Sequence, residues 1–483
     1  MTRAGASAAT AWSAADILLR QALSFGISIV LARLLTPTDF GTVALAAFFS
    51  SLSIALLHTG LATALVRRQA TSRDEESAVF WWCLGASIVM GAVLVAAAPW
   101  IAAYFEQPVL RALMWMTTGQ LVFAAIGVVP TAMLTRALDI KPLTVAGIIA
   151  SLVSGAVGIG TSLAGAGLWA IALQLASASL VNSIALWFVS DWRPTTHWHF
   201  ATLRGLLRFS ANLSASSALD IVYTYGFALV VGKMHGVRDL GLYNRAQGTQ
   251  QLPGNVVAMI LGRVALPIFA AANHDPPRQL DDVRTAVRAA MIVNLPAMVV
   301  LALLADLVIL VLFGSKWSGA APVLAILAVG GTLIPLHVIN LQLLLAQDRS
   351  DRFLKVEVAK KVAGIGCVLV GSLFGIIGLA IGQAVFGVFA FVINAHFTRH
   401  SIGYGALAQL RDLVLIALLS VALGAVIVVA RNLVDLPPGL ELLCLLGVGG
   451  VTYLVLALPL AHHLFPDHPL RSQVASLLGS GDG

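Results

Sequence analysis

The stretch Phe25-Gly-Ile-Ser-Ile-Val-Leu-Ala-Arg33 recurs 200 residues later as Tyr225-Gly-Phe-Ala-Leu-Val-Val-Gly-Lys233. The alignment continues without a gap, so that Asp39-Phe40-Gly41 matches Asp239-Leu240-Gly241. Apolar helices resemble one another easily, because they use few residue types. A shared basic residue, followed after five residues by Asp, an apolar residue and Gly, is harder to obtain by chance. We therefore predict that the chain contains an internal duplication.

The repeated segment predicts a tight hairpin between two helices, on the outer side of a membrane. Asp39 and Asp239 are residues that can cap the helix that follows. Gly41 and Gly241 lack a side chain and would allow neighbouring helices to pack closely. The same local structure is therefore expected in both copies.

The composition predicts a membrane protein. The chain has 483 residues, of which 59% are hydrophobic and 11% are charged, whereas soluble proteins carry about 25% charged residues. A soluble fold of this length could not cover its surface with so few charges. The net charge of +7 is explained by basic cytoplasmic loops, and it gives no reason to expect a nucleic-acid partner.

A transmembrane helix needs about 20 apolar residues, and the chain divides into fourteen such runs. The Gly165-Ala166-Gly167 turn splits one run of double length, and Gly375 to Gly378 splits another. The predicted spans are residues 14–35, 40–66, 78–103, 112–134, two within 143–190, 209–231, 240–269, 289–313, 319–346, two within 362–398, 413–430 and 442–460. The expected fold class is an all-α polytopic membrane protein.

The loop charges predict the orientation. With the N-terminus in the cytoplasm, twenty Lys and Arg residues fall inside and six fall outside. Basic residues favour the cytoplasmic side, so both termini are expected there. The repeat predicts two six-helix lobes, residues 1–200 and 201–400, related by an axis along the membrane normal. Residues 401–483 would add two further helices and a cytoplasmic tail.

Several function classes are disfavoured by the sequence. No loop is longer than about twenty residues by this assignment of spans, and the chain has no P-loop and no Gly-rich dinucleotide fingerprint. An ATP-driven pump within the chain is excluded, and a membrane enzyme that polymerises or ligates glycans would need a larger external loop. Cys83, Cys367 and Cys444 lie far apart in apolar runs. We expect no enzymatic activity, no catalytic residue, no metal and no cofactor.

Four stretches resemble a known family of bacterial polysaccharide exporters. These are Ile29-Val-Leu-Ala-Arg-Leu-Leu-Thr-Pro-Thr-Asp-Phe-Gly-Thr-Val-Ala-Leu-Ala46, Leu240-Gly-Leu-Tyr-Asn-Arg-Ala-Gln247 with Leu252-Pro253, Val129-Pro-Thr-Ala-Met-Leu-Thr-Arg136 and Gly165-Ala-Gly-Leu-Trp-Ala170. The resemblance runs from about residue 11 to residue 460. The chain is identified as a member of the flippase branch of the multidrug/oligosaccharidyl-lipid/polysaccharide exporter superfamily.

The resemblance implies movement of an undecaprenyl-diphosphate-linked oligosaccharide across the bacterial cytoplasmic (inner) membrane, by alternating access. Such transport would serve the synthesis of exopolysaccharide, capsule or O-antigen. The implied partners are the lipid-linked glycan, membrane lipids, and a polysaccharide polymerase with its export machinery. The chain departs from the family where related sequences often carry Asn or Asp late in the seventh helix, since Phe227 and Ala228 stand there.

Charged residues inside spans are the candidate site residues, because each costs at least about 2.5–3.5 kcal/mol at the bilayer centre. An arginine within a span suits a diphosphate, whose oxygens match its planar fork. Arg20, Arg263 and Arg245 are therefore candidates for substrate binding in a cationic cavity. Asp220 and Asp16 are candidates for ion coupling or for pairing with an arginine.

Each candidate also has a simpler explanation. Asp16 and Arg20 could form an (i, i+4) pair that reaches toward the cytoplasmic interface. Arg263 could anchor its helix, and Arg245 could lie at the outer interface. Asp220 could be a proton or cation site or the partner of an arginine. Isolated polar residues such as His58 and Asn340 are more often hydrogen-bonded packing residues.

Three other functions remain open at this point. The first is a cation-coupled antiporter of drugs or small molecules from the same superfamily, which would favour carboxylates and aromatic residues in its cavity. The second is a membrane enzyme acting on glycans. The third is a flippase of peptidoglycan precursors, although the polysaccharide branch is the closer match.

Overall fold

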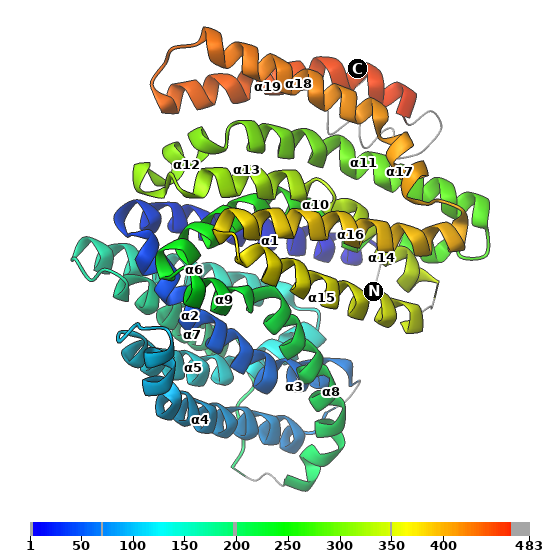
Figure 1. Cartoon of the computed structure of the whole chain (residues 1–483). Helices are drawn as coiled ribbons and strands as arrows, with labels where there is room; N and C mark the ends of the chain where they lie inside the picture. The colour runs from blue at the N-terminus through cyan, green and yellow to red at the C-terminus, as the bar shows by residue number, and fades with distance from the viewer. Residues whose placement is uncertain (1–2, 69–70, 197–199, 348–349, 465–483) are drawn as a thin grey trace. The chain divides into compact units, whose positions relative to one another are not determined.

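The computed structural model describes residues 3–68, 71–196, 200–347 and 350–464 (Figure 1). Within these ranges all regular structure is helical, and the helices are labelled α1 to α19, with a π-helical segment η1 and a 3-10 turn η2. The chain forms two compact units, Met1–Gly241 and Leu242–Gly483. The all-α prediction is confirmed.

The first unit contains α1 to α9 and the start of α10. Its helices are α1 (Arg3–Leu34), α2 (Pro37–Ile54), η1 (Ala55–Thr59), α3 (Gly60–Arg67), α4 (Arg73–Tyr104), α5 (Leu110–Arg136), α6 (Ile140–Leu163), α7 (Trp169–Val189), α8 (Phe200–Tyr225) and α9 (Phe227–Met234). Within this unit α4 packs against α5 and α6 against α7, while α1 packs on α6 and α7 on α5 (Figure 1). A buried cluster around Phe80, Cys83 and Val129 joins α3, α4 and α5.

The second unit contains the rest of α10 and all later helices. These are α10 (Val237–Ala271), α11 (Pro276–Leu303), α12 (Ala305–Phe313), η2 (Ser315–Trp317), α13 (Ala320–Gly331), α14 (Ile334–Ala346), α15 (Ser350–Ser372), α16 (Gly375–Ile402), α17 (Ala406–Asp412), α18 (Val414–Leu433) and α19 (Pro438–Leu464). Here α15 pairs with α16, and α18 pairs with α19 (Figure 1). A buried cluster of this unit includes Phe269, Met291 and Phe391.

Eleven helical segments among the described residues are long and apolar enough to cross a membrane. They correspond to eleven of the predicted spans, so the chain is a polytopic membrane protein. The other three predicted spans lie on α1, α10 and α15. The total of fourteen stays a prediction.

The glycine turns agree with the sequence in one case and differ in the other. Gly165 and Gly167 have φ angles of 83° and 57°, and they separate α6 from α7 as predicted. Between α15 and α16 the turn falls at residues 373–374, and Gly375, with φ of 76°, already opens α16. Gly378 lies inside α16, where a Cβ atom would approach the Gly371 carbonyl oxygen to 2.5 Å. The predicted turn was therefore misplaced, because Gly378 serves helix packing.

Three predicted spans are each built from two shorter helices. Span 209–231 is broken at Gly226, span 289–313 at Leu304, and span 319–346 at Thr332 and Leu333. The last break precedes Pro335 in the first turn of α14, since a proline inside a continuous helix lacks one hydrogen bond and clashes with the carbonyl four residues earlier. Apolar composition does not reveal such breaks, because the residues on both sides of each break are mostly apolar.

The hairpin after the first helix has a capping box. Thr36 is the N-cap of α2, and its Oγ1 accepts a hydrogen bond from the Asp39 N–H at 3.3 Å. The Asp39 carboxylate in turn accepts the Thr36 N–H at 2.9 Å. Asp39 therefore supports the cap from the third helical position, whereas the sequence prediction made it the cap itself. In the second copy, Asp239 lies in the first turn of α10, where a carboxylate favours the positive end of the helix.

The boundary between the compact units differs from the predicted lobe boundary. The structure divides the chain after Gly241, because α8 packs on η1 and α3 of the first unit. The sequence-based division follows the repeat and stays a prediction. It consists of the lobes 1–200 and 201–400 and the extra region 401–483.

Candidate functional site

Arg20 lies on α1 and reaches the neighbouring helix α6. Its Nη2 donates a hydrogen bond to the Leu143 carbonyl oxygen. The guanidinium lies directly over Gly147, since a Cβ atom there would be 1.9 Å from Nη1 of Arg20. The absence of a side chain at residue 147 therefore creates the space in which this charge is held. Arg20 is half-buried, and its guanidinium is held by a hydrogen bond and by close packing. A side chain that only reached toward the membrane interface would need neither contact.

Two other candidates cannot be placed by their side chains. Asp16 belongs to α1 and Arg263 to α10, but both side chains lie outside the described part of the structure. The predicted Asp16–Arg20 pair and the predicted role of Arg263 therefore remain predictions.

Arg245 of α10 packs against aromatic rings of the second unit. Its guanidinium carbon lies 4.9 Å from the centre of the Phe313 ring and 5.4 Å from that of Trp317. Both rings are fully buried. Stacking on an aromatic face stabilises a guanidinium, so this geometry gives Arg245 a packing role at the α12–η2 corner.

Asp220 lies on α8, where its side chain is exposed. Arg20 lies on α1 and contacts α6, so Arg20 and Asp220 belong to different helices. The helix that carries Asp220 is held by an unusual feature. At Gly60, where the π-helical segment η1 ends, a Cβ atom would lie 2.2 Å from the Ser210 carbonyl oxygen. The Gly60 N–H also donates to Ser214 Oγ at 3.2 Å. The π-helix thus provides the close approach that positions α8.

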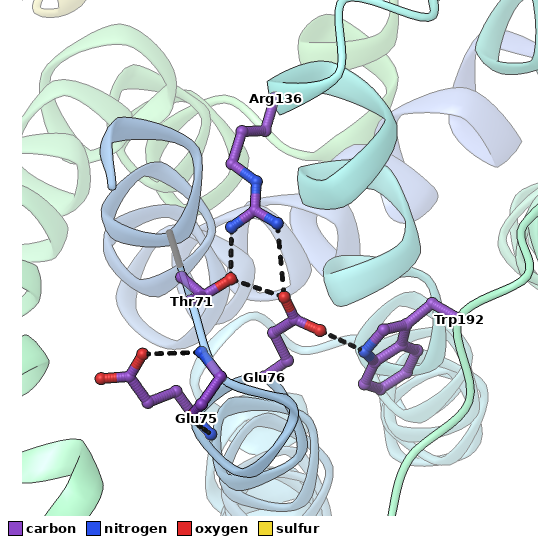
Figure 2. Close-up of polar contacts among 6 residues, drawn as sticks. Thr71, Glu75, Glu76, Arg136 and Trp192 are labelled. Carbon is purple, nitrogen blue, oxygen red and sulfur yellow. Dashed lines mark hydrogen bonds and ion pairs between the residues drawn. The ribbon is translucent and has the colours of Figure 1, made fainter. Parts of the chain in front are cut away.

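Glu76, near the start of α4, is a buried carboxylate with several bonded partners (Figure 2). Its Oε1 accepts a hydrogen bond from Thr71 Oγ1 at 2.5 Å and lies 3.4 Å from Arg136 Nη2. Its Oε2 accepts the Trp192 Nε1–H at 2.8 Å. Arg136 also donates to Thr71. Glu76 is only 5% exposed, and these donors offset the cost of removing its charge from water.

Sequence reasoning missed this cluster. Ser72 and Glu75 form a capping box for α4, which is a readable signal for a helix start. The next residue, Glu76, is one of three acids in the first turn. Nothing in the local sequence distinguishes it from Asp74 and Glu75. Its partners Arg136 and Trp192 are 60 and 116 residues away, so only the fold brings them together.

The second unit has a buried amide network. Asn340 Nδ2 donates to Gln409 Oε1 at 3.1 Å, and Asn340 Oδ1 accepts from Gln409 Nε2 at 2.9 Å. Thr398 Oγ1 donates to the same Asn340 oxygen at 2.7 Å. All three residues are fully buried. Asn340 therefore joins α14, α16 and α17 through hydrogen bonds between side chains, in the way expected of a packing residue.

A charged cluster borders this network at α17. Asp412 lies 3.3 Å from both Arg284 and Arg288 of α11, and it accepts the Tyr404 hydroxyl at 2.9 Å. Burial raises the pKa of Tyr404, and the hydrogen bond to Asp412 raises it further. The tyrosine therefore acts as a neutral donor, and Asp412 remains the counter-charge of the two arginines.

The guanidinium of Arg20 can hold an anion, and the two carboxylate clusters connect neighbouring helices. Arg20 offers a fixed guanidinium, while Glu76 and Asp412 are carboxylates that pair with arginines of other helices. No group of three or more potential metal ligands occurs among the described residues.

Comparison with known proteins shows the family to which the chain belongs. Residues 30–322 match the family model of a polysaccharide biosynthesis protein. The succinoglycan biosynthesis transport protein ExoT of Rhizobium meliloti is 28% identical over 317 residues, which is 65% of this chain and 64% of ExoT. The match therefore spans slightly less than two thirds of ExoT.

A second relative is matched over more of its length. The lipopolysaccharide biosynthesis protein WzxC of Escherichia coli is 27% identical over 380 residues, 77% of this chain and 76% of WzxC. The solved structure of the lipid II flippase MurJ in an inward closed conformation superposes with a TM-score of 0.74, at 13% identity, over 93% of this chain and 98% of MurJ. At that identity the match shows a shared fold. Since the family model covers more than half of the sequence, the chain belongs to the polysaccharide biosynthesis protein family.

Proposed function

We propose that the protein is a flippase that translocates an undecaprenyl-diphosphate-linked oligosaccharide across the bacterial cytoplasmic membrane by alternating access. The observation that carries the proposal is the coincidence of two matches. The family model of polysaccharide biosynthesis covers residues 30–322, and the fold of the lipid II flippase MurJ covers 93% of the chain. The transport protein ExoT supports the same assignment. The protein would act as a transporter and have no enzymatic activity.

The cargo suggests how the charged residues are used. A diphosphate cannot cross hydrocarbon without a counter-charge, whereas the polyprenyl tail can remain in the bilayer. We assign the diphosphate to Arg20, whose guanidinium is fixed over Gly147, with Arg263 as a second candidate. Twenty basic residues on one side against six on the other support cytoplasmic termini. A polysaccharide polymerase and export machinery would act on the translocated product.

The test is deletion of the gene in its native host, followed by measurement of lipid-linked oligosaccharide in each leaflet. We expect the cargo to accumulate on the cytoplasmic side and surface or secreted polysaccharide to be lost. Mass spectrometry of the trapped lipid would identify its sugars. Complementation with the wild-type gene must restore both. Unchanged polysaccharide with new drug sensitivity would contradict the proposal and point to an antiporter.

A further inference from the structure

An open apolar groove lies on the first unit, between α4, α5 and α7. Its volume is about 500 Å³, within the range of about 300–1,000 Å³ that is typical of ligand sites. Its walls are aliphatic and aromatic, and Arg193 lies at its edge. The principal wall residues are Trp81, Leu84, Ile126, Leu180, Ile184 and Trp187.

We propose that this groove binds one acyl chain of an anionic glycerophospholipid, with the lipid phosphate at Arg193. The inference concerns a membrane lipid and not the transported cargo, and it does not rest on the proposed function. It follows from the position of one guanidinium, from the way the loop around it is fixed, and from the exposure of the groove.

The aromatic walls have fixed orientations. Trp81 Nε1 donates to the Thr195 carbonyl oxygen at 3.0 Å, and Trp187 Nε1 donates to the Ile126 carbonyl oxygen at 3.1 Å. Both indole N–H groups are therefore satisfied by the backbone. The carbon faces of the rings are left to contact an apolar ligand.

Arg193 places a positive charge where the groove ends. Its guanidinium carbon lies 5.4 Å from the Trp187 ring centre. Nη1 donates to the Ser190 and Trp192 carbonyl oxygens at 2.7 and 2.6 Å, and Nη2 donates to the Trp187 carbonyl oxygen at 2.8 Å. A guanidinium has five N–H donors, so these bonds leave capacity for phosphate oxygens. The side chain is exposed and can reach a lipid headgroup.

The loop that carries Arg193 is fixed by buried residues of α4. Trp192 donates to the Glu76 carboxylate (Figure 2). The Thr195 N–H donates to Ser77 Oγ at 2.9 Å. Glu76 is 5% exposed and Ser77 is fully buried. The charged cluster of Figure 2 therefore holds Arg193 at the groove. Its role thus extends beyond stabilising the loop itself.

The exposure of the groove favours a membrane lipid as its occupant. Ile184 and Phe188 lie on the same helix and are 46% and 85% exposed. On a membrane-spanning helix, such apolar side chains contact acyl chains. Arg193 lies on the loop that follows the predicted cytoplasmic end of α7, where the leaflet contains anionic lipids. A single positive charge beside an apolar groove complements a single phosphodiester with an acyl tail.

The test is native mass spectrometry of the purified full chain, titrated with phosphatidylglycerol and with phosphatidylcholine of the same acyl chains. We expect one phosphatidylglycerol to bind preferentially. Arg193→Gln should weaken it about fivefold, the typical effect of one basic residue at an anionic lipid surface. Arg193→Lys should keep the preference, because it retains the charge. Arg68→Gln is the matched control, since Arg68 lies at the same predicted membrane end, outside the groove, and pairs with Glu75 at 2.5 Å.

A second variant tests the groove without changing any charge. Ile184→Trp introduces a bulky side chain at an exposed wall position, so it should reduce binding of both phospholipids while the protein remains monodisperse. Equal binding of the two phospholipids by the wild type would overturn the proposal. So would unchanged phosphatidylglycerol binding by both Arg193→Gln and Ile184→Trp. Undecaprenyl phosphate that displaces phosphatidylglycerol at equal concentration would also overturn it and assign the groove to a polyprenyl chain.

Discussion

Gly41 and Gly241, equivalent residues of the internal repeat, pack against each other reciprocally. A Cβ atom on Gly41 would lie 1.7 Å from the Val237 carbonyl oxygen and 2.9 Å from the Gly241 nitrogen. A Cβ atom on Gly241 would lie 1.9 Å from the Pro37 carbonyl oxygen and 3.1 Å from the Gly41 nitrogen. Pro37 and Val237 are also equivalent in the repeat. The contact therefore has local two-fold character, and it confirms the close packing predicted for these glycines.

The first prediction concerns this contact. Gly41→Ala should destabilise the protein by about 1–3 kcal/mol, because the new methyl group meets backbone atoms that cannot move aside. Thermal unfolding in detergent at a fixed scan rate measures the effect. Gly26→Ala is the matched control, since nothing lies within 4 Å of the Cβ position on Gly26. That change should be neutral or stabilising, and equal melting temperatures for the two variants would refute the packing argument.

Eleven of the membrane spans were predictable, since hydropathy can be read locally from the chain. The hairpin before the second helix was readable for the same reason, although the structure makes Thr36 the N-cap and places Asp39 at the third helical position. Helix breaks such as the one at Gly226 were not readable, because the residues on both sides are apolar. Their positions depend on packing between helices.

The candidate site was predictable only in part. Arg20 could be singled out because an arginine inside a span is costly, but its contact with Gly147 depends on how α1 and α6 pack. Glu76 was overlooked, because it follows exposed acids and its partners are distant in sequence. Arg245 was singled out by charge, and the structure surrounds it with Phe313 and Trp317. Its packing role comes from those aromatic neighbours, which the charge pattern does not indicate.

The second prediction concerns the Glu76 cluster. Glu76→Gln should lower stability by about 1.5–3 kcal/mol, since it removes a charged acceptor from Trp192 and Thr71 and leaves Arg136 without its counter-charge. A double-mutant cycle with Trp192→Phe should give a coupling energy of at least about 0.5 kcal/mol, because the two side chains share a hydrogen bond. Asp74→Asn, at an exposed position in the same first turn of α4, should have little effect. Additive effects of Glu76→Gln and Trp192→Phe would contradict the proposed coupling.

The third prediction concerns pH. The hydrogen bond from Lys233 Nζ to Glu106 Oε1, at 2.8 Å, lowers the pKa of Glu106. A carboxylate with a lowered folded-state pKa stabilises the protein above its ordinary value of about 4.3, and the stabilisation is lost as the pH falls through the lowered value. The melting temperature of Glu106→Gln should therefore be below that of the wild type near neutral pH. The difference should disappear in acid.

Lys233→Met serves as the control for this pH effect. It removes the partner, so substituting Glu106 in that background should change the melting temperature much less near neutral pH. If the melting temperatures of the wild type and Glu106→Gln still differ by the same amount in strong acid, the ionised carboxylate is not the cause of the difference.

The last prediction separates the charge of Arg20 from its position. Arg20→Ala should lower transport by more than about tenfold while insertion persists, because hydrogen bonds to a charged group contribute about 1.5–3 kcal/mol. Gly147→Ala keeps the charge but moves it, since the new Cβ atom would overlap the flexible end of Arg20. It should reduce transport with little loss of stability. Gly160→Ala, on the same helix in open space, should transport normally. Leaflet-resolved measurement of lipid-linked oligosaccharide in complemented deletion strains gives the readout. Normal transport by both Arg20→Ala and Gly147→Ala would remove Arg20 from the cargo site, while the family membership would stand.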